Sequence, residues 1–228
     1  MYISPSSVTF SRLYIYNKSL MNHFKNIFLS LTVATTTLTS FAQGNADKMG
    51  IQAYMKSDYK GAVTYLEKAT VNDPNNTSTL KMLGYSYYQC GDYENSITAY
   101  SKLILLKPAD YTALYYRGKA RLNIANAPKE SLNQMRESFY LSAIKDFSKA
   151  LEIAGDEDTQ VFQNRGIAYK DYAIFKSFKI KKSTEKVACV TIFNSAIADF
   201  QKVLTLQPSR RDISSLIDYV KAQITSLK

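Results

Sequence analysis

The side chains that most often carry out catalysis are scarce in this chain. His23 is the one histidine in 228 residues, and Cys90 and Cys189 are the two cysteines. Catalysis by a serine or cysteine nucleophile commonly needs a histidine base, and zinc sites need several histidine or cysteine ligands. The eight glycines are scattered and form no phosphate-binding loop. We therefore predict that the chain is not an enzyme and uses no cofactor, metal or small-molecule substrate.

Carboxylates are the remaining candidates for chemistry. The acidic run at residues 156–158 could bind a cation, but Asp158 directly precedes an expected helix. An aspartate in that position accepts hydrogen bonds from the first free backbone N–H groups of a helix, and we favour this capping role. A carboxylate-based active site between long helical hairpins is the enzymatic alternative.

Two stretches of the chain match when one is shifted by 34 residues. The first set of positions is Gly50, Ser57, Asp58, Tyr59, Ala62, Leu66, Ala69 and Pro74. The second set is Gly84, Gly91, Asp92, Tyr93, Ser96, Tyr100, Leu103 and Pro108. A fixed period of this size predicts stacked supersecondary units, which build binding surfaces more often than active sites.

The second stretch resembles a tetratricopeptide repeat. The resemblance rests on Leu80, Leu83, Gly84, Tyr85, Gly91, Asp92, Tyr93, Ser96, Tyr100 and Pro108. Leu80 stands where the family usually has Trp, and Ser96 where it has its small residue before the second aromatic. The resemblance implies two antiparallel helices per unit, stacked into a right-handed superhelix with a concave groove.

The residue types agree with paired helices. Gly84 lacks a Cβ in the middle of a helix, which is useful where two helices approach closely although it costs about 1 kcal/mol relative to Ala. Gly91 and Asp92 end one helix and cap the next. Pro108 has no backbone N–H, so the second helix should end before it.

Two further units contain insertions. The third has 13 extra residues and the fourth has 18, both at the turn between the paired helices. In the third unit we expect Pro128 to begin a helix with Leu132, Met135, Phe139, Ala143, Phe147 and Ala150 along one face. In the fourth we expect Tyr172, Phe175 and Phe178 to extend the first helix, and Ser183 to cap a second helix with Val187, Val190, Phe193, Ile197 and Phe200 along its apolar face.

The insertions therefore predict two tall hairpins on one edge of the solenoid. If the extra residues divide evenly, each arm is about 10–13 Å longer than in the first two units. A disordered loop between helices of ordinary length is the alternative.

The predicted fold class is all-α: a right-handed solenoid of four TPR-like hairpins with a C-terminal capping helix. The expected segments are a leader (1–42), four repeats (43–76, 77–110, 111–157 and 158–208) and the capping helix (209–228). The capping helix would cover the last exposed apolar face, as solenoids require.

The leader has the pattern of a secretory signal. Residues 27–41 are apolar with many Thr and Ser, Lys25 precedes them, and Ser40-Phe41-Ala42 fits a cleavage site. The stretch is too short and polar for a stable span, which needs about 20 apolar residues. Met21 would open a signal of ordinary length. From this signal we expect a periplasmic or secreted protein. The alternative interpretation of residues 27–41 is a buried first helix.

Export would place both cysteines in an oxidising compartment. Bridging requires Cα atoms within about 7 Å, which cysteines two units apart do not satisfy. We expect free, partly buried thiols, and a disulfide is the alternative. The cleavage site contains no cysteine, so lipid attachment at that site is not expected.

The first helix of each unit should line the groove. Helical spacing places Tyr54, Lys81, Tyr85, Tyr88, Tyr115 and Lys119 on that side. Tyrosine is favoured in recognition surfaces, so we expect these residues to bind a protein or peptide segment. Packing between repeats is the alternative for each ring. The family's clamp for a terminal carboxylate is not expected, because Tyr85 stands where that clamp needs Asn.

The formal net charge is +10. The leader contains three basic residues and no acidic one, so its removal would leave +7. Five lysines lie near the expected tip of the fourth hairpin: Lys176, Lys179, Lys181, Lys182 and Lys186. They could bind an anionic envelope polymer or membrane, or simply keep the tip soluble. Nucleic acid is a poor partner for an exported protein.

The sequence thus predicts an exported, non-catalytic scaffold for protein interactions. The alternative function is an envelope surface-association module that uses the lysine-rich tip.

Overall fold

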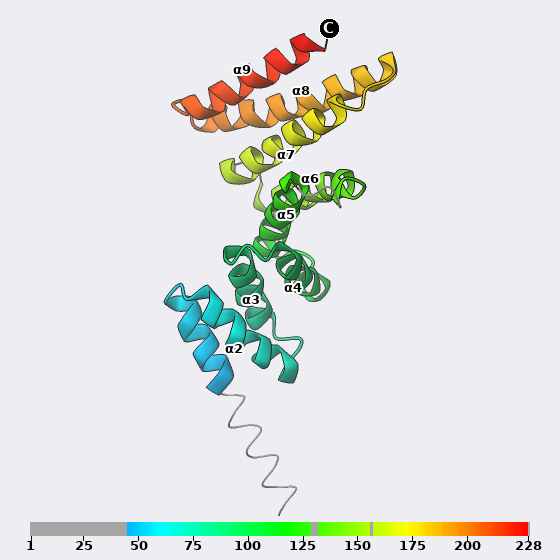
Figure 1. Ribbon diagram of the computed structural model, residues 1–228. Coiled ribbons are helices and arrows are strands. Elements are labelled where there is room, and N and C mark those ends of the chain that lie inside the picture. The colour runs from blue at the N-terminus through cyan, green and yellow to red at the C-terminus, as the bar shows by residue number, and fades with distance from the viewer. Residues whose placement is uncertain (1–44, 129–131, 156, 228) are drawn as a thin grey trace, which may run out of the picture. The chain divides into compact units, whose positions relative to one another are not determined.

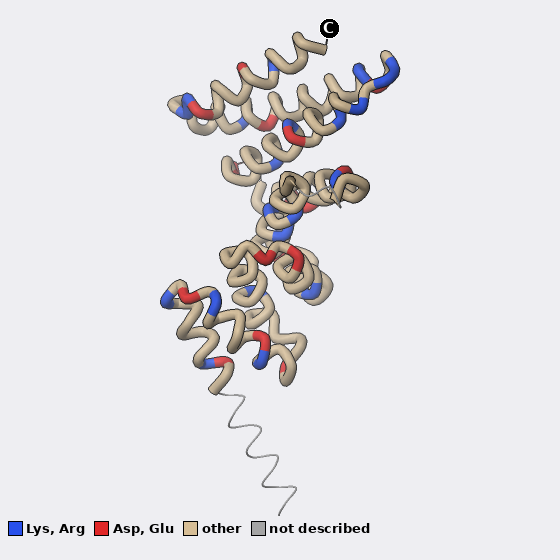
Figure 2. The backbone as a smooth tube through the Cα atoms, in the orientation of Figure 1, with Lys and Arg blue, Asp and Glu red and all other residues tan. Residues whose placement is uncertain are grey.

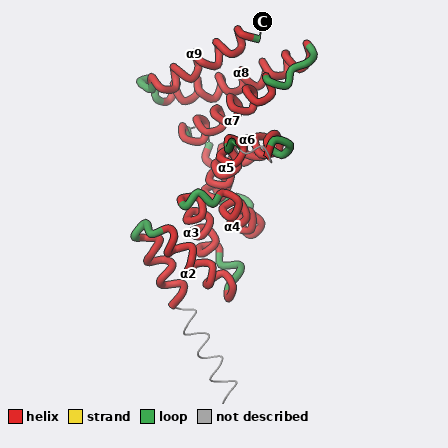
Figure 3. The backbone as a smooth tube through the Cα atoms, in the orientation of Figure 1, coloured by secondary structure: helices red, strands yellow, loops and turns green. Residues whose placement is uncertain are grey.

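The computed structural model describes residues 45–128, 132–155 and 157–227, and within these ranges there are helices and turns but no strand (Figure 3). The chain divides into two compact units, Met1–Lys48 and Met49–Lys228. The first unit is described only at residues 45–48, so the fold below is that of Met49–Lys228 by itself. The predicted signal, its cleavage after Ala42 and the alternative start at Met21 lie outside the described residues.

The second unit is a series of helices that pack in chain order (Figure 1). Residues 49–55 are the end of a helix and are followed by α2 (Tyr59–Asn72), α3 (Thr77–Gln89), α4 (Tyr93–Leu106), α5 (Tyr111–Asn126), α6 (Arg136–Ala154), α7 (Thr159–Ser177), α8 (Ser183–Leu206) and α9 (Arg211–Ser226). In addition, α3 contacts α5 and α5 contacts α7, so the first helices of successive hairpins form a layer. The predicted all-α repeat fold is confirmed.

Helix boundaries follow from the capping residues. Asp58, Asp92, Asp110 and Asp158 each accept a hydrogen bond from the backbone N–H of a residue in the first turn of the next helix. The predicted capping role of Asp158 is therefore confirmed. After the C-terminal end of α3, Gly91 has a φ of 77°, a left-handed conformation that glycine adopts without strain.

Close contact within each hairpin explains the mid-helix glycines. A Cβ added to Gly84 would lie 3.0 Å from the ring of Tyr100. At Gly166 the new Cβ would lie 2.7 Å from Cε1 of Phe200. In the second, third and fourth hairpins the two helices thus approach at a glycine of the first and an aromatic ring of the second, as the sequence predicted for Gly84.

Helices α7 and α8 form the tallest hairpin. They contain 19 and 24 residues, against 13 and 14 in α3 and α4. At 1.5 Å per residue the two arms are longer by about 9 and 15 Å. The third hairpin gains less, because α5 and α6 contain 16 and 19 residues and much of its insertion lies in the connection between them.

Three details of the inserted segments differ from prediction. Pro128 does not begin a helix: α6 starts at Arg136, so Leu132 and Met135 precede it and stay outside its apolar face. Ser183 is the first residue of α8 rather than its cap. The carboxylate of Glu185 instead accepts the backbone N–H groups of Lys181 and Lys182, which satisfies donors that a serine cap would have left free.

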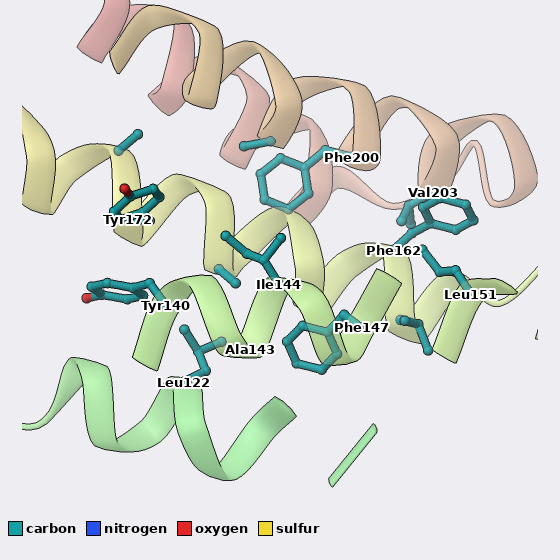
Figure 4. Packing of buried hydrophobic residues seen from close by; sticks show 14 of the residues in the cluster. Leu122, Tyr140, Ala143, Ile144, Phe147, Leu151, Phe162, Tyr172, Phe200 and Val203 are labelled. Carbon is teal, nitrogen blue, oxygen red and sulfur yellow. The ribbon is translucent and has the colours of Figure 1, made fainter. Parts of the chain in front are cut away.

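The apolar core is shared between neighbouring hairpins. The largest cluster extends from α5 to α9 and includes the fully buried rings of Phe147 and Phe200 (Figure 4). On α9, Ile213, Ile217 and Val220 are buried in this cluster, so α9 covers the end of the stack as predicted. No hairpin of this length could bury such a core alone, so each depends on its neighbours.

Within the described part of the chain, α8 is long and apolar enough to cross a membrane by length and composition. It packs between α7 and α9. Its Phe193, Ala196, Phe200 and Val203 are fully buried there. In this fold α8 therefore serves as a core helix of the repeat stack.

The two cysteines are free thiols. Cys90 directly follows α3 and is exposed, in contrast to the partly buried state predicted. Cys189 is buried in α8, where its Sγ lies 3.2 Å from the carbonyl oxygen of Ala173 and donates a hydrogen bond to it. Burial raises the pKa of the Cys189 thiol, and partial desolvation beside the end of α3 raises that of Cys90.

Candidate partner-binding surface

Tyrosines from the first helices of three successive hairpins meet on one face, together with the tyrosines that begin α2 and α4. We call the following set the tyrosine surface: Tyr54, Tyr59, Tyr85, Tyr88, Tyr93, Tyr115, Tyr116 and Lys119. Residues three or four positions apart share a face of a helix, which brings Tyr85 and Tyr88 together on α3. The same spacing places Tyr115 and Tyr116 beside Lys119 on α5.

The rings pack edge to face in a continuous series. The centroid of Tyr85 lies 5.7 Å from Tyr54, 5.6 Å from Tyr59 and 4.9 Å from Tyr116. Tyr116 continues the series to Tyr88, at 5.4 Å. Aromatic rings prefer such angled contacts. The surface is therefore ordered before any partner arrives.

Lys119 lies over three of these rings. Its Nζ is 5.1 Å from the centroid of Tyr88 and 5.4 Å from those of Tyr115 and Tyr116. These distances are typical of cation–π interactions. Among the residues that the structure describes, no carboxylate forms an ion pair with Lys119. The surface thus presents an ammonium group that lies against ring faces and has no ion-pair partner among the described side chains.

Lys81 differs from Lys119 because it has an acidic partner. Its Nζ lies 2.6 Å from a carboxylate oxygen of Asp110. Beside this pair is a hollow of about 220 Å³ lined by Tyr54, Thr77, Ser78, Lys81, Met82, Lys107 and Asp110. The hollow adjoins the tyrosine surface through Tyr54, so a bound segment could continue into it.

The predicted surface residues differ in exposure. Tyr54, Tyr85, Tyr88, Lys81 and Lys119 are half-buried, which leaves part of each side chain accessible. Tyr115 is only 8% exposed, and its ring stacks on Tyr111 while its hydroxyl oxygen accepts a hydrogen bond from Asn164. Tyr115 therefore fits the alternative role, packing between repeats.

Burial affects the ionisation of three phenols in this region. It raises the pKa of Tyr54, Tyr115 and Tyr116 above the ordinary tyrosine value. The ordinary value of about 10 already keeps a tyrosine neutral at physiological pH, and the rise reinforces this. The half-buried Tyr54 and Tyr116 can therefore donate hydrogen bonds to a partner.

Sequence reasoning missed four residues of the site: Tyr59, Tyr93, Tyr116 and Asn123. Tyr116, which contacts four other tyrosines, was overlooked because it is the direct neighbour of Tyr115 and a helix normally points adjacent residues apart. Asn123 was also missed: its amide nitrogen donates to the hydroxyl oxygen of Tyr88 at 3.3 Å. Its position four residues after Lys119 is the signal that could have found it.

Buried ion pairs join the two helices within the third hairpin and, separately, within the fourth. Arg117 Nε and Nη2 donate to the two carboxylate oxygens of Asp146 at 2.9 and 2.7 Å. Arg121 Nη1 donates to the same carboxylate at 2.5 Å. Arg117 also reaches back to the hydroxyl of Ser101 on α4, at 3.1 Å. One arginine thus joins its own hairpin and the preceding one.

The fourth hairpin repeats this arrangement. Arg165 Nε and Nη2 donate to Asp199 at 2.8 and 2.7 Å, and its Nη1 donates to Ser148 on α6 at 3.1 Å. The hydrogen bond to Asp199 raises the pKa of Arg165. Burial raises the pKa of Asp199 more than the arginine lowers it. These carboxylates are engaged by arginines in the core.

The five predicted tip lysines lie where α7 meets α8. Lys176 is in the last turn of α7 and Lys186 is in the first turns of α8, with Lys179, Lys181 and Lys182 at or beside the turn (Figure 2). We call these five residues the basic tip. In the described residues, no group of three or more His, Cys, Asp and Glu side chains could hold a metal ion.

Stacked helical hairpins with an ordered aromatic face define an interaction scaffold of the repeat type. Residues 84–124 match the family model for the TPR repeat. This segment of the chain is thus a tetratricopeptide repeat, and scaffolds built from such repeats are generally non-catalytic.

Solved structures show the same fold. A crystal structure of MamA protein is 19% identical, with a TM-score of 0.60 over 82% of this chain and 86% of the other. The structure of MamA from Desulfovibrio magneticus RS-1, residues 41 to the end, is 16% identical, with a TM-score of 0.59 over 82% of this chain and 89% of the other. None of the curated proteins compared with the chain matches it.

Proposed function

We propose that this protein is an exported scaffold that binds a protein or peptide segment on the tyrosine surface. The observation that carries the proposal is Lys119, whose ammonium group lies on three tyrosine rings and has no acidic partner among the described side chains. A partner that supplies an acceptor group there gains a charge-assisted hydrogen bond, which is stronger than a neutral one.

The surface has the composition of a protein-binding site. Tyrosine contributes a large contact area and a polar tip, and it is enriched among residues that dominate binding energy. Because Tyr85 and Tyr88 are already held by other rings, little side-chain entropy is lost when a partner binds. Backbone groups of a peptide can accept hydrogen bonds from the neutral phenols.

Export is the second part of the proposal. It is supported by the apolar stretch at residues 27–41 and the small residues Ser40 and Ala42. The test is the mature N-terminus, determined by mass spectrometry on protein recovered from outside the cytoplasm of the producing cell. A chain that begins at Gln43 is expected, and an uncleaved chain retained in the cytoplasm would contradict export.

Partner binding can be tested with a photo-crosslinking amino acid at position 88. Illumination of the producing cells should join Tyr88→benzoylphenylalanine to a protein, and mass spectrometry would identify the segment that touches it. The matched control carries the same amino acid at Tyr219, which is 46% exposed on α9 and far from this surface in sequence. The control should give no such product.

Lysine substitutions then test the role of charge. In the position-88 crosslinker, Lys119→Gln should reduce the product at least fivefold, which corresponds to about 1 kcal/mol. Lys102→Gln, at a half-buried lysine on α4, is the control and should leave it unchanged. Equal crosslinking at positions 88 and 219, or no effect of Lys119→Gln, would remove the proposal.

A further inference from the structure

The basic tip also exposes large apolar side chains. Phe178, which directly follows α7, is 85% exposed, and Val187 on α8 is 65% exposed. Both were expected on the apolar faces of their helices, yet the structure leaves them outside the core. Tyr172, six residues before Phe178 and within α7, is 7% exposed. The core therefore ends before the hairpin does.

The tip is positively charged in the region where these side chains are exposed. Lys179, Lys181 and Lys182 are all exposed, and Figure 2 shows basic residues gathered at this turn. The carboxylate of Glu185 accepts hydrogen bonds from the backbone N–H groups of Lys181 and Lys182, at 2.6 and 3.1 Å. Residues 176–186 contain five lysines and one acidic residue, so the net charge of the turn is positive.

The turn that carries this surface is braced from within. Lys179 Nζ lies 3.9 Å from the ring centroid of Phe175, and Lys176 forms a 3.1 Å ion pair with Glu137 on α6. The hydroxyl of Tyr172 donates to the same carboxylate of Glu137 at 2.7 Å. The third hairpin thus supports the fourth, and Phe178 is held at the end of a lengthened arm.

We propose that the basic tip docks on an anionic lipid bilayer, with Phe178 inserted at the boundary between headgroups and acyl chains. Lysines are attracted to anionic headgroups, and an aromatic side chain gains by burial in the interfacial region. An anionic polymer would satisfy the lysines but offers no apolar phase for Phe178. The combination of both side-chain types favours a bilayer.

The chain contains no tryptophan, so Phe178→Trp would place a single fluorescent reporter at the tip of the full-length protein. Vesicles of phosphatidylcholine mixed with phosphatidylglycerol should shift its emission to shorter wavelength, and brominated acyl chains should quench it. Vesicles of phosphatidylcholine alone should do neither. Because the reporter senses only its own surroundings, binding through the leader would not produce the signal.

The matched control is Leu105→Trp, at a residue 83% exposed on α4. Its emission should not respond to either type of vesicle. If position 105 responds as strongly as position 178, or if position 178 does not respond, the proposal is wrong.

Charge is tested in the Phe178→Trp background. Each lysine near an anionic surface contributes roughly a fivefold gain in affinity, so Lys181→Ser with Lys182→Ser should weaken vesicle binding about 25-fold. Lys56→Ser with Lys221→Ser, at exposed lysines elsewhere, should have little effect. Added salt should weaken binding of the unaltered tip.

Two results would redirect the assignment. Equal loss with both lysine pairs would show a response to net charge and would overturn the tip as the docking site. Retention on a soluble polyanion that depends on Lys181 and Lys182, with no vesicle response at position 178, would identify a polymer site and refute the bilayer.

Discussion

Replacing Asp146 by alanine removes the carboxylate that neutralises two guanidinium groups in the third hairpin. The side chain of Asp146 is 2% exposed, and those of Arg117 and Arg121 are 15% and 19% exposed. Removal of one partner from a buried ion pair costs about 3–5 kcal/mol, because a desolvated charge is left uncompensated. We expect Asp146→Ala to lower the unfolding free energy of the α5–α6 hairpin by that amount.

The assay must resolve single hairpins, because repeat proteins need not unfold in one cooperative step. Amide hydrogen exchange in α5 and α6 gives the local free energy of opening, and urea unfolding followed by circular dichroism gives the overall effect. The control is Asp212→Ala, whose carboxylate is 59% exposed in its ion pair with Arg210. This surface change should cost no more than about 0.5 kcal/mol.

A rescue variant separates charge from packing. Methionine at positions 117, 121 and 146 together removes all three charges, and such apolar replacements of buried ion networks are often neutral or stabilising. The triple variant should recover most of the stability lost in Asp146→Ala. A loss below about 1 kcal/mol for Asp146→Ala, comparable to an ordinary surface change, would refute the reasoning, as would a triple variant no more stable than the single one.

Three further predictions concern other parts of the stack. Gly166→Ala should destabilise the fourth hairpin by about 1–3 kcal/mol, because its new Cβ would lie 2.7 Å from the ring of Phe200; thermal unfolding measures this, and an unchanged midpoint would contradict the close contact. Hydrogen bonds from a tyrosine and then a lysine of α7 lower the pKa of Glu137. The stabilising contribution of the Glu137 carboxylate is therefore complete above the ordinary glutamate pKa of about 4.3 and is lost as pH falls through the lowered value. In Glu137→Gln the midpoint of thermal unfolding should accordingly depend less on pH in the acid range. A pH dependence like that of the unaltered chain would contradict this. The exposed Cys90 should react with a thiol reagent in the folded chain and the buried Cys189 only on unfolding, whereas equal rates by mass spectrometry would be inconsistent with these burials.

The repeat fold could be predicted because its determinants are local. Gly84 and Tyr100 lie within one short hairpin, and Gly50 and Leu66 have the same spacing in the hairpin before it. Aspartates such as Asp92 and Asp158 mark helix starts through bonds to residues two or three positions away. The start of α6 was predicted too early because Pro128 is compatible with both a helix start and a turn.

The buried ion pairs could not be predicted from a fixed period. Arg117 pairs with a residue 29 positions later, and Arg165 with one 34 positions later, because the two insertions differ in length. The available signal was compositional: Arg precedes the close-contact glycine in both hairpins, and Asp146 and Asp199 each precede the facing phenylalanine. The exposure of Phe178 also depends on where the core ends, which apolar periodicity does not reveal.

The bonds from Arg117 to Ser101 and from Arg165 to Ser148 join successive hairpins through the same two side-chain types. Ser101 and Ser148 follow the inward-facing aromatic of their helices, and Gln201 follows Phe200 in the same way on α8. A duplicated copy of the fourth hairpin would find an acceptor at Gln201 and could be inserted ahead of α9. The array can accordingly grow by whole modules during evolution or in the laboratory, with its terminal helix carried outward unchanged.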